Sequence, residues 1–238
     1  MLPSRCAVAA VAPVNHPGYA WRMKKVAVLG SGKVGEILAD GFLKHRYAVM
    51  RGSRDPSKVA AWKASAKGEA QTGTFADAAK WAEIVVLAVK GSAAEAAVEQ
   101  AGIGNLAGKL VIDATNPIAD GPPVNGLIPY FTRSDESLME RLQTKAPAAH
   151  FVKAWNSVGN AFMVNPKFPL PPTMFICGND AAAKREATAI LDQFGWEAAD
   201  VGTVISARVI EPLCQLWCLP GFLRNEWAHA FKLMQPTA

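Results

Sequence analysis

The sequence predicts an α/β fold: a doubly wound, mostly parallel sheet followed by a small helical extension at the C-terminus. Three observations carry this prediction. Short apolar runs at 26–29, 84–89 and 110–113 are typical of parallel strands buried on both faces. Segments of helical periodicity alternate with these runs, and a glycine-rich turn directly follows the first one. With 238 residues, half of them hydrophobic and 19% charged, the chain is long enough to bury one sizeable core.

The turn after the first strand has the spacing of a dinucleotide-binding loop. Its residues are Gly30, Ser31, Gly32, Lys33, Val34 and Gly35, and they open a helix with one apolar face. Gly30 permits the tight turn, Gly32 lets a pyrophosphate approach the backbone, and Gly35 lets the helix lie close to the strand. The free N–H groups at the start of the helix would face an anion. Strand, turn and helix together predict a Rossmann-type cofactor site.

The end of the second strand indicates which dinucleotide binds. An Asp or Glu there accepts hydrogen bonds from the ribose hydroxyls of NAD, whereas a 2′-phosphate needs cations and hydroxyl donors. This chain has Ser53 and Arg54 at that point. Asp55 comes one residue later, before Pro56, where it is expected to cap the next helix. We therefore predict NADP(H), against the alternative that Arg54 is a solvated loop residue.

The rest of the first half continues the alternation. We expect a helix at 56–67, a short strand at 70–73, a brief helix capped by Thr74, and the strand at 84–89. Ala88, Val89 and Lys90 end that strand, where ligands bind in open α/β sheets. Lys90 either contacts a phosphate or is a surface lysine. A helix at 93–101 and the strand at 110–113 follow.

Asp113-Ala-Thr-Asn-Pro117 lies at the end of that last strand. Asn116 is placed to hold the nicotinamide carboxamide, and Pro117 to keep the loop rigid beside the ring. The alternative is an ordinary Asn-Pro turn. The stretch at 121–131 is rich in proline and glycine, so we expect a loop over the site rather than part of the core.

Three stretches together carry a family resemblance: Gly30-Ser-Gly-Lys-Val-Gly35, Gly52-Ser-Arg54 and Asp113-Ala-Thr-Asn-Pro117. They resemble the NADP oxidoreductases that use a deazaflavin coenzyme, coenzyme F420, and their bacterial relatives. The same fold type resembles the cytoplasmic reductase domain of the membrane ferric reductases. The resemblance runs from about Met23 to Met234. It implies NADP(H) as cofactor, coenzyme F420 as a candidate acceptor, and homodimers that share the C-terminal region.

After a helix at 136–145 and a strand at 150–154 comes the loop of Trp155, Asn156, Ser157 and Val158. In the family this loop lines the pocket opposite the nicotinamide. We expect the Trp155 indole to stack on a flat heterocycle, and Asn156 and Ser157 to donate to its carbonyls. The archaeal deazaflavin reductases resemble this stretch but tend to have histidine where Asn156 stands, which bears on the coenzyme more than on the fold.

The C-terminal region should contain a strand at 173–178, a helix from Asp180 to about Phe194, and a last strand at 196–201. From Ile205 we expect a helix broken or kinked at Pro212 and Pro220, with a second helical piece at 222–234. This apolar tail either covers the sheet or forms a subunit contact. We divide the chain into a leader at 1–22 that is disordered or a misassigned start, an NADP-binding domain at 23–154, and a region for acceptor binding and dimerisation at 155–238.

Composition excludes several classes of function. The net charge of +5 comes without a Lys/Arg block, so no nucleic-acid face is expected, and no run is apolar enough to span a bilayer. The four cysteines lack disulfide spacing, which favours a reducing, cytoplasmic location; Cys214 and Cys218 are expected to pack rather than bind metal. No certain catalytic residue, acid, base or nucleophile, stands out.

That absence fits hydride transfer between two preorganised rings, because the cofactors carry the reactivity themselves. Three functions stay open from the sequence. The first is reduction of a deazaflavin by NADPH. The second is reduction of another small-molecule acceptor, such as a flavin, a ferric chelate or a carbonyl compound. The third is NADPH sensing without turnover.

Overall fold

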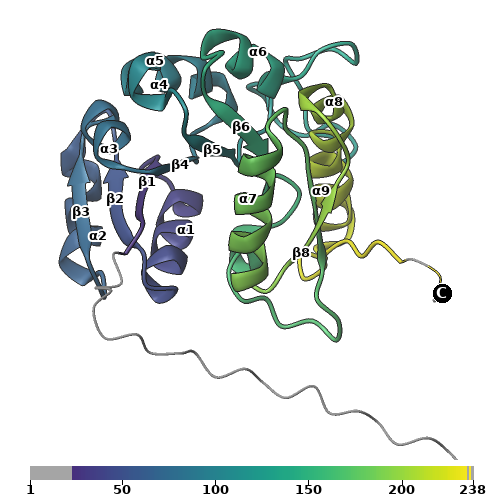
Figure 1. Ribbon diagram of the computed structural model, residues 1–238. Coiled ribbons are helices and arrows are strands. Elements are labelled where there is room, and N and C mark those ends of the chain that lie inside the picture. Colours follow the sequence, from purple (N-terminus) through teal and green to yellow (C-terminus); the bar gives the residue numbers. More distant parts are fainter. Residues whose placement is uncertain (1–22, 235, 237–238) are drawn as a thin grey trace, which may run out of the picture.

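The computed structural model describes residues 23–234 and 236 and confirms the predicted α/β class. Six strands form one parallel sheet in the order β3-β2-β1-β4-β5-β6 (Figure 1). The strands are β1 (Lys25–Leu29), β2 (Ala48–Gly52), β3 (Ala70–Gly73), β4 (Ile84–Leu87), β5 (Leu110–Asp113) and β6 (His150–Lys153). The leader predicted at 1–22 lies outside the described residues.

The register of the sheet brings the ends of five strands level. Leu29 pairs with Gly52 and Leu87, Leu87 pairs with Asp113, and Asp113 pairs with Lys153. The loops that follow β1, β2, β4, β5 and β6 therefore leave from one edge of the sheet. That edge is where ligands bind in folds of this type.

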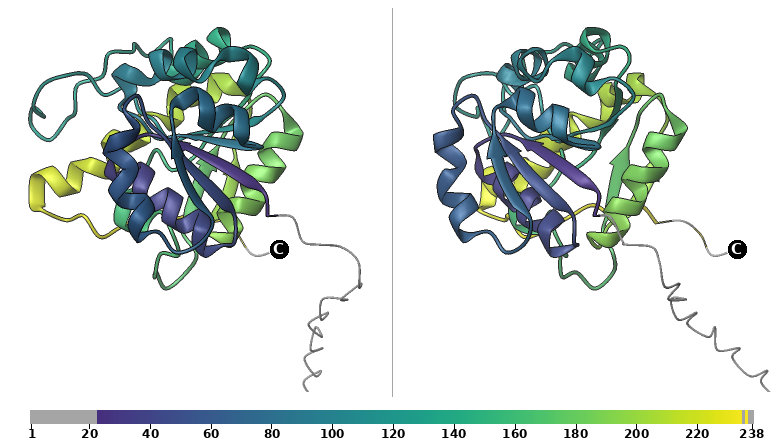
Figure 2. Two further views of the ribbon diagram at one scale, coloured as in Figure 1. Left: turned by 90° about the vertical axis from the view of Figure 1, so that its left-hand side faces the viewer. Right: turned by 60° about the vertical axis from the view of Figure 1, so that its left-hand side comes forward.

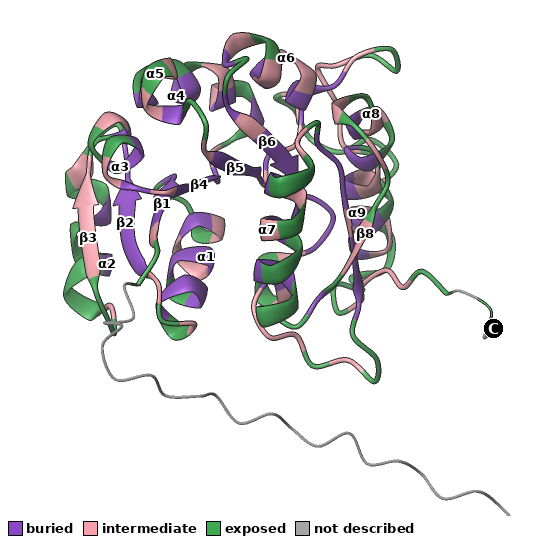
Figure 3. Cartoon of the chain, viewed as in Figure 1, coloured by how far each residue is buried: buried purple, intermediate pink, exposed green. Residues whose placement is uncertain are grey.

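Helices cover both faces of the sheet, as Figure 2 shows. They are α1 (Lys33–Lys44), α2 (Ala60–Ser65), α3 (Phe75–Trp81), α4 (Ala94–Ala101), α5 (Ile103–Leu106), α6 (Leu138–Lys145), α7 (Ala181–Gln193), α8 (Ala207–Ile210) and α9 (Leu213–Arg224). Alternate residues of β1 enter different cores: Val26 and Val28 pack with α1 and α7, whereas Ala27 and Leu29 pack with α3, α4 and α6. Figure 3 shows the central strands buried, as expected of a strand covered on both faces.

Two predicted caps, Asp55 and Thr74, are confirmed. Asp55 accepts a hydrogen bond from the Ser57 N–H at the start of the turn that leads into α2. Thr74 and Asp77 form a reciprocal capping box at α3. Asp180 accepts from the Ala183 N–H at the start of α7.

The C-terminal strands stand apart from the main sheet. β7 (Thr173–Ile176) and β8 (Glu197–Asp200) form a separate two-stranded parallel sheet, which joins β6 through a single bridge at Lys153 and Cys177. The region still shares a core with the first half, because Met174 and Phe194 belong to the same hydrophobic cluster as Val26. The described residues from 155 to 234 therefore add to the core of the first half rather than building one of their own.

The predicted break at Pro212 is confirmed, because α8 ends at Ile210 and α9 begins at Leu213. The prediction of a second helical piece at 222–234 is wrong. α9 runs through Pro220 to Arg224 instead of breaking there, and the residues at 225–234 form no helix. Asn225 ends α9 in the left-handed conformation, at φ 58°, and its N–H binds the Gly221 carbonyl. The chain then folds back, so that a Cβ on Gly221 would lie 2.3 Å from the Trp227 ring.

The stretch at 121–131 is irregular, as predicted, with one isolated bridge between Val124 and Leu127 and another from Ile118 to Tyr130. Among the residues at 23–234 and 236, no helix is long and apolar enough to cross a membrane.

Candidate functional site

A pocket of about 240 Å³ opens between the ends of β1 and β4. This is the point at which the strand order reverses, the position that Rossmann-type sheets use for ligands. Eight of the predicted cofactor residues line it: Gly30, Ser31, Gly32, Ser53, Arg54, Ala88, Val89 and Lys90. The sequence had not singled out the remaining lining residues, which are Phe75 on α3 and Ala93, Ala96, Ala97 and Gln100 in and before α4.

The glycine loop has the geometry that its sequence predicts. Gly30 lies at φ 148°, and a Cβ there would meet the Ala88 carbonyl oxygen at 2.2 Å, so β1 can turn this close to the end of β4 only with glycine. A Cβ on Gly35 would lie 2.8 Å from the Gly30 carbonyl oxygen, whereas one on Gly32 would meet nothing within 4 Å. The loop is therefore tight on its inner side and open at Gly32.

The start of α1 is left for a ligand. Gly32 is its N-cap, and within the part of the chain that the structure describes no side-chain hydrogen bond caps this end of the helix. Such groups attract anions, both through their hydrogens and through the helix dipole. Lys33, Val34 and Gly35 do not line the pocket, and the Lys33 ammonium instead binds Glu36 at 2.8 Å.

At the end of β2, Ser53 is buried and Arg54 is exposed. The Ser53 hydroxyl oxygen accepts from the Asp55 N–H at 3.2 Å, so its hydrogen remains to be donated. The Asp55 carboxylate binds the Ser57 hydroxyl at 2.6 Å and is thereby held away from the role of a ribose acceptor. Within the described chain, Arg54 makes no hydrogen bond or ion pair, so its guanidinium is free to meet an anion at the pocket.

Lys90, on the β4 side of the pocket, is exposed and pairs with Asp120. The pairing ties the end of β4 to the loop beyond Pro117. Whether Lys90 also meets a phosphate stays a prediction.

Asn116 and Asn156 join the loops after β5 and β6. The Asn116 amide donates to the Asn156 backbone carbonyl at 2.8 Å, and the Asn156 amide donates to the Asn116 side-chain oxygen at 3.2 Å and to the Ile210 carbonyl at 2.9 Å. Both N–H groups of the Asn156 side chain are thus used within the protein. The prediction that Asn156 donates to the carbonyls of an acceptor is wrong for this arrangement, while Asn116 is half-buried and remains a candidate.

Trp155 is a clear correction to the predicted site. Its side chain is 1% exposed and packs against Phe42 of α1 and Phe194 of α7, with ring centroids 6.2 and 5.3 Å away. Neither face of the indole is open, so the predicted stacking on a flat acceptor is wrong. The indole N–H has no hydrogen-bond partner, and the backbone is left-handed at φ 59°, an unusual conformation for a bulky residue.

Ser157 and Val158 follow Trp155 and are almost fully buried. Of the predicted acceptor loop, Ser157 alone keeps a hydroxyl for which no hydrogen bond is found in the described part of the chain. The assignment of the loop to an acceptor site stays a prediction for these two residues.

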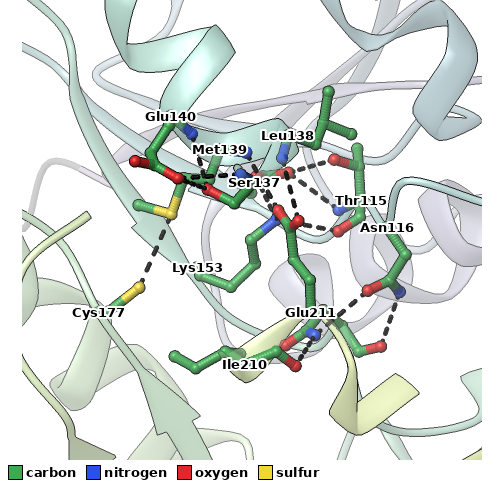
Figure 4. A network of polar contacts seen from close by, with 12 residues as sticks. Thr115, Asn116, Ser137, Leu138, Met139, Glu140, Lys153, Cys177, Ile210 and Glu211 are labelled. Atoms are coloured by element: carbon green, nitrogen blue, oxygen red, sulfur yellow. Dashed lines mark hydrogen bonds and ion pairs between the residues drawn. The ribbon is translucent and has the colours of Figure 1, made fainter. Parts of the chain in front are cut away.

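A buried ionic group lies behind the loop that carries Asn116. The Lys153 ammonium lies 2.6 Å from Asp113 and 2.9 Å from Glu211, and it donates to the Thr115 carbonyl at 3.0 Å. All three charged side chains are at most 2% exposed. Figure 4 shows Lys153 beside Glu211, whose carboxylate accepts from the Leu138 and Met139 N–H groups at the start of α6, both at 3.0 Å.

Electrostatics keeps the Lys153 ammonium charged. Burial by itself lowers the pKa of Lys153, but the carboxylates of Asp113 and Glu211 outweigh that effect and raise the pKa. The ammonium is therefore charged, and it fixes the backbone at Thr115 directly before Asn116. The group connects β5, β6, α6 and α8, so it acts as a structural clamp on one wall of the site.

The sequence also missed Arg51, although a signal was present. Arg51 is a charged residue inside the otherwise apolar strand β2, which has a neighbouring strand on each side, and Lys153 ends β6, the edge strand of the six-stranded sheet. Such a charge requires a buried partner. Among the described residues, no three His, Cys, Asp or Glu side chains are placed to hold a metal ion.

The pocket fits one end of a dinucleotide. Its volume of about 240 Å³ is below the roughly 300–1,000 Å³ typical of pockets that hold a whole small ligand. It combines the open space at Gly32, the uncapped start of α1 and the unpaired Arg54. These features suit a phosphate-bearing group. The loops that carry Asn116 and Ser157 leave the same edge of the sheet but do not line this pocket.

Comparison with known proteins identifies relatives. A family model described as NADP oxidoreductase, coenzyme F420-dependent, matches residues 25–117. The crystal structure of a candidate F420-dependent NADP reductase from Arthrobacter sp. FB24 is 32% identical in sequence, with a TM-score of 0.82, and the match covers 88% of this chain and 99% of that one.

Two curated proteins are similar at lower identity. The F420-dependent NADP reductase of Methanocaldococcus jannaschii is 28% identical over 206 residues, which are 81% of this chain and 90% of that protein. The metalloreductase STEAP3 of Rattus norvegicus is 28% identical over 204 residues. That match covers 84% of this chain but only 39% of the rat protein, so the chain spans less than half of that relative.

Proposed function

Because the chain belongs to the family of coenzyme F420-dependent NADP oxidoreductases, and so is an NADP-dependent oxidoreductase, we propose that it transfers hydride between NADPH and a deazaflavin. The family supports the class of reaction. The choice of a deazaflavin, and the residues that hold each partner, are our proposal. The single observation that carries the proposed NADPH site is the glycine-loop pocket, which Arg54 helps to line.

The selectivity for NADP rests on what stands at the end of β2. Arg54 lines the pocket without an ionic partner in the described chain, and the nearest carboxylate in sequence, Asp55, is already bound to Ser57. A 2′-phosphate needs a cation and hydroxyl donors, which Arg54 and Ser53 supply. A ribose of NAD would need an acceptor that this position does not offer.

In the mechanism, the protein binds and orients. Gly30, Ser31 and Gly32 would hold the pyrophosphate against the start of α1, while Ser53 and Arg54 would hold the 2′-phosphate. Asn116 and Pro117, in the loop after β5, would lie beside the nicotinamide, and the hydrogen bond from Lys153 to the Thr115 carbonyl would keep that loop in position. NADPH, when bound, supplies the hydride.

Reduction of the deazaflavin takes up the hydride and one proton; the proton would come from solvent, so we assign no acid or base of the chain to this reaction. Cys177 lies near the clamp, but burial raises the pKa of its thiol to about 12, so it is no nucleophile at neutral pH. The side of the site near Ser157 and Val158 is the proposed acceptor face. With Trp155 buried, the acceptor must find its stacking surface in the nicotinamide itself.

A second candidate is the reduction of another acceptor, a flavin or a ferric chelate. The similarity to the rat metalloreductase favours it, since that protein is named for the reduction of metal. A third reading is an NADPH-binding sensor without turnover. All three share the same cofactor site and differ in what approaches it.

The test is to mix the purified protein with NADPH and oxidised coenzyme F420 and to follow the absorbance of both. Free flavin, a ferric chelate and NADH serve as parallel substrates. We expect saturable oxidation of NADPH with stoichiometric reduction of the deazaflavin, and slower reaction with NADH. Tight NADPH binding without deazaflavin reduction would contradict the proposed acceptor and leave the cofactor site in place; turnover with the ferric chelate would then support the second candidate.

Two further assignments go with this function as proposals. Residues 23–154 bind the cofactor and residues 155–238 complete the acceptor side and the subunit contact of a homodimer. The cytoplasmic location inferred from the cysteines stays a prediction.

A further inference from the structure

Arg51 is a buried cation in β2 without an acidic contact. Arg51 is only 2% exposed. In the described chain, no carboxylate lies within ion-pair distance of its guanidinium. Its Nε has no hydrogen-bond partner. Burial lowers the pKa of the guanidinium, and the more distant carboxylates of Glu36 and Asp40 oppose that effect. A buried charge is normally compensated, so this one requires an explanation.

Its contacts place the guanidinium directly against the glycine loop. One terminal nitrogen donates to the Gly30 carbonyl at 3.1 Å and to the Gly32 carbonyl at 3.2 Å. The same nitrogen lies 3.6 Å from the position that a Cβ on Gly35 would take. Arg51 does not line the pocket, so it supports the loop from the protein side.

The indole of Trp62 holds the guanidinium in place. The guanidinium carbon lies 5.3 Å from the Trp62 ring centroid, within the range of a cation–π contact. Trp62 is in turn fixed by a hydrogen bond of 2.7 Å from its indole N–H to Asp40 on α1. The strand, α1 and α2 therefore combine to keep one charge beneath the loop.

The two hydrogen bonds from Arg51 also determine where the N–H groups of the same peptide units point. In a trans peptide the C=O and the next N–H point in opposite directions, and the described chain contains no cis peptide bond. When Arg51 draws in the carbonyls of Gly30 and Gly32, the N–H groups of Ser31 and Lys33 are turned away from the protein interior. These are donors in the loop and in the first turn of α1, where a phosphate is expected.

We propose that Arg51 is a positioning residue for phosphate binding: it orients the donors of the glycine loop and adds a positive charge beneath them. The inference rests on the proposed cofactor site and deepens it. Arg51 acts on the pyrophosphate, which NADPH and NADH share, whereas Arg54 acts on the 2′-phosphate of NADPH alone. The phosphate groups are then the missing counter-charge of the buried cation.

The experiment measures equilibrium binding of NADPH and NADH to three variants. Arg51→Met removes both charge and donors, Arg51→Gln keeps a neutral donor, and Arg51→Lys keeps the charge. We expect Arg51→Met to weaken the binding of both nucleotides by about tenfold, the order expected for one charge acting over several ångströms inside a protein. Arg51→Lys should bind closest to wild type, and Arg51→Gln should lie between the two.

Arg54→Met and Arg133→Met are the matched comparisons, because each also removes one arginine charge. Arg54→Met should weaken NADPH and leave NADH nearly unchanged. Arg133 is exposed and is not among the residues that line the pocket, so its variant should bind both nucleotides as wild type does. Raising the salt concentration should shrink the effect of Arg54→Met more than that of Arg51→Met, since buried charges are screened less.

The outcomes separate the inference from the function on which it rests. If the wild-type protein binds neither nucleotide, the proposed function fails. If the wild-type protein binds the nucleotides and Arg51→Met binds each of them as tightly as wild type does, with an unchanged melting temperature, the role of Arg51 is overturned. A loss confined to NADPH would also overturn it. Should Arg51→Met not fold, the Lys and Gln variants decide: equal binding by both would contradict the role of the charge.

Discussion

Lys153 shows at the scale of one residue how a buried charge is kept. Its ammonium contacts Asp113 and Glu211, which come from β5 and from directly after α8. Two carboxylates and one ammonium would leave an excess negative charge, but the N–H groups at the start of α6 donate to Glu211. Removing the ammonium leaves two buried carboxylates without their shared cation, which is costlier than removing the whole group.

We predict that Lys153→Met destabilises the protein by about 3–5 kcal/mol. The change is measured by chemical denaturation of the variant and the wild type. Combining it with Asp113→Asn should recover part of the loss, because one of the two stranded carboxylates is then neutral. If the double variant lost the sum of the two single effects, the residues would not be coupled.

Arg54 is the residue on which cofactor choice should depend. Arg54→Glu places a carboxylate where the 2′-phosphate is expected, and we predict a loss of roughly 2–4 kcal/mol in NADPH binding with a much smaller change for NADH. Lys63→Glu, on the exposed side of α2, controls for the change in net charge. Equal losses for both nucleotides in titrations would rule out a role for Arg54 in recognising the 2′-phosphate.

The local part of the site could be predicted from sequence and the rest could not. The residues of the glycine loop are consecutive in the chain, as are Ser53 and Arg54, so each group can be recognised from the sequence, and both groups contribute to one pocket. The predicted stacking of Trp155 on an acceptor is wrong because an aromatic residue after a strand can face either a ligand or the core. The choice here is made by Phe42 and Phe194, which come from distant helices.

At the scale of elements, the same distinction explains the C-terminal error. The apolar spacing at 222–234 resembles a helix, but this segment packs by tertiary contacts. The Thr173 N–H donates to the Phe231 carbonyl at 2.8 Å, and the Leu233 N–H donates to the Thr173 hydroxyl at 3.1 Å, so the segment lies along the start of β7. The central strands of the sheet are predictable because their burial on both faces leaves a continuous apolar signature.

The turn between β1 and α1 permits a matched pair of variants. Gly32 has an ordinary extended backbone, at φ −79°, and open space at the Cβ position, whereas a Cβ on Gly35 would clash with the Gly30 carbonyl. Gly32→Ala should therefore fold with an unchanged melting temperature and lose about tenfold or more in NADPH affinity, because its methyl occupies the space of the pyrophosphate.

Gly35→Ala should instead lose both properties. The displaced loop costs about 1–3 kcal/mol of stability, as overpacking generally does, and the phosphate donors move with it. Thermal melting and nucleotide titration of both variants test the pair. Unchanged NADPH binding by Gly32→Ala would show that the pyrophosphate does not pass over this position.

At the scale of the whole molecule, one face remains apolar in the single chain. Val124, Leu127, Val209, Leu216 and Leu223 are each more than half exposed. They lie on α8, α9 and the loop at 121–131, and the loop touches α9, since a Cβ on Gly126 would come 2.9 Å from Leu219. The elements α8 and α9 lie next to each other in Figure 1. A face of this kind marks a contact surface.

A second copy of the chain is the occupant that we predict, as the family resemblance implies. Leu216 is 54% exposed on α9, and in a two-fold contact it would be buried once in each subunit. Leu216→Asp should then cost about 3 kcal/mol or more of association free energy and convert dimers to monomers at micromolar concentration. Leu170→Asp is the control, because Leu170 is also 54% exposed but lies in the loop before β7.

Sedimentation velocity measures both variants over a range of concentrations. A monomeric wild type, or a Leu216→Asp variant that stays dimeric, would contradict a subunit contact at this face. Dissociation of Leu216→Asp but not of Leu170→Asp would place the contact on α9, beside the loop that follows Asn116 and Pro117.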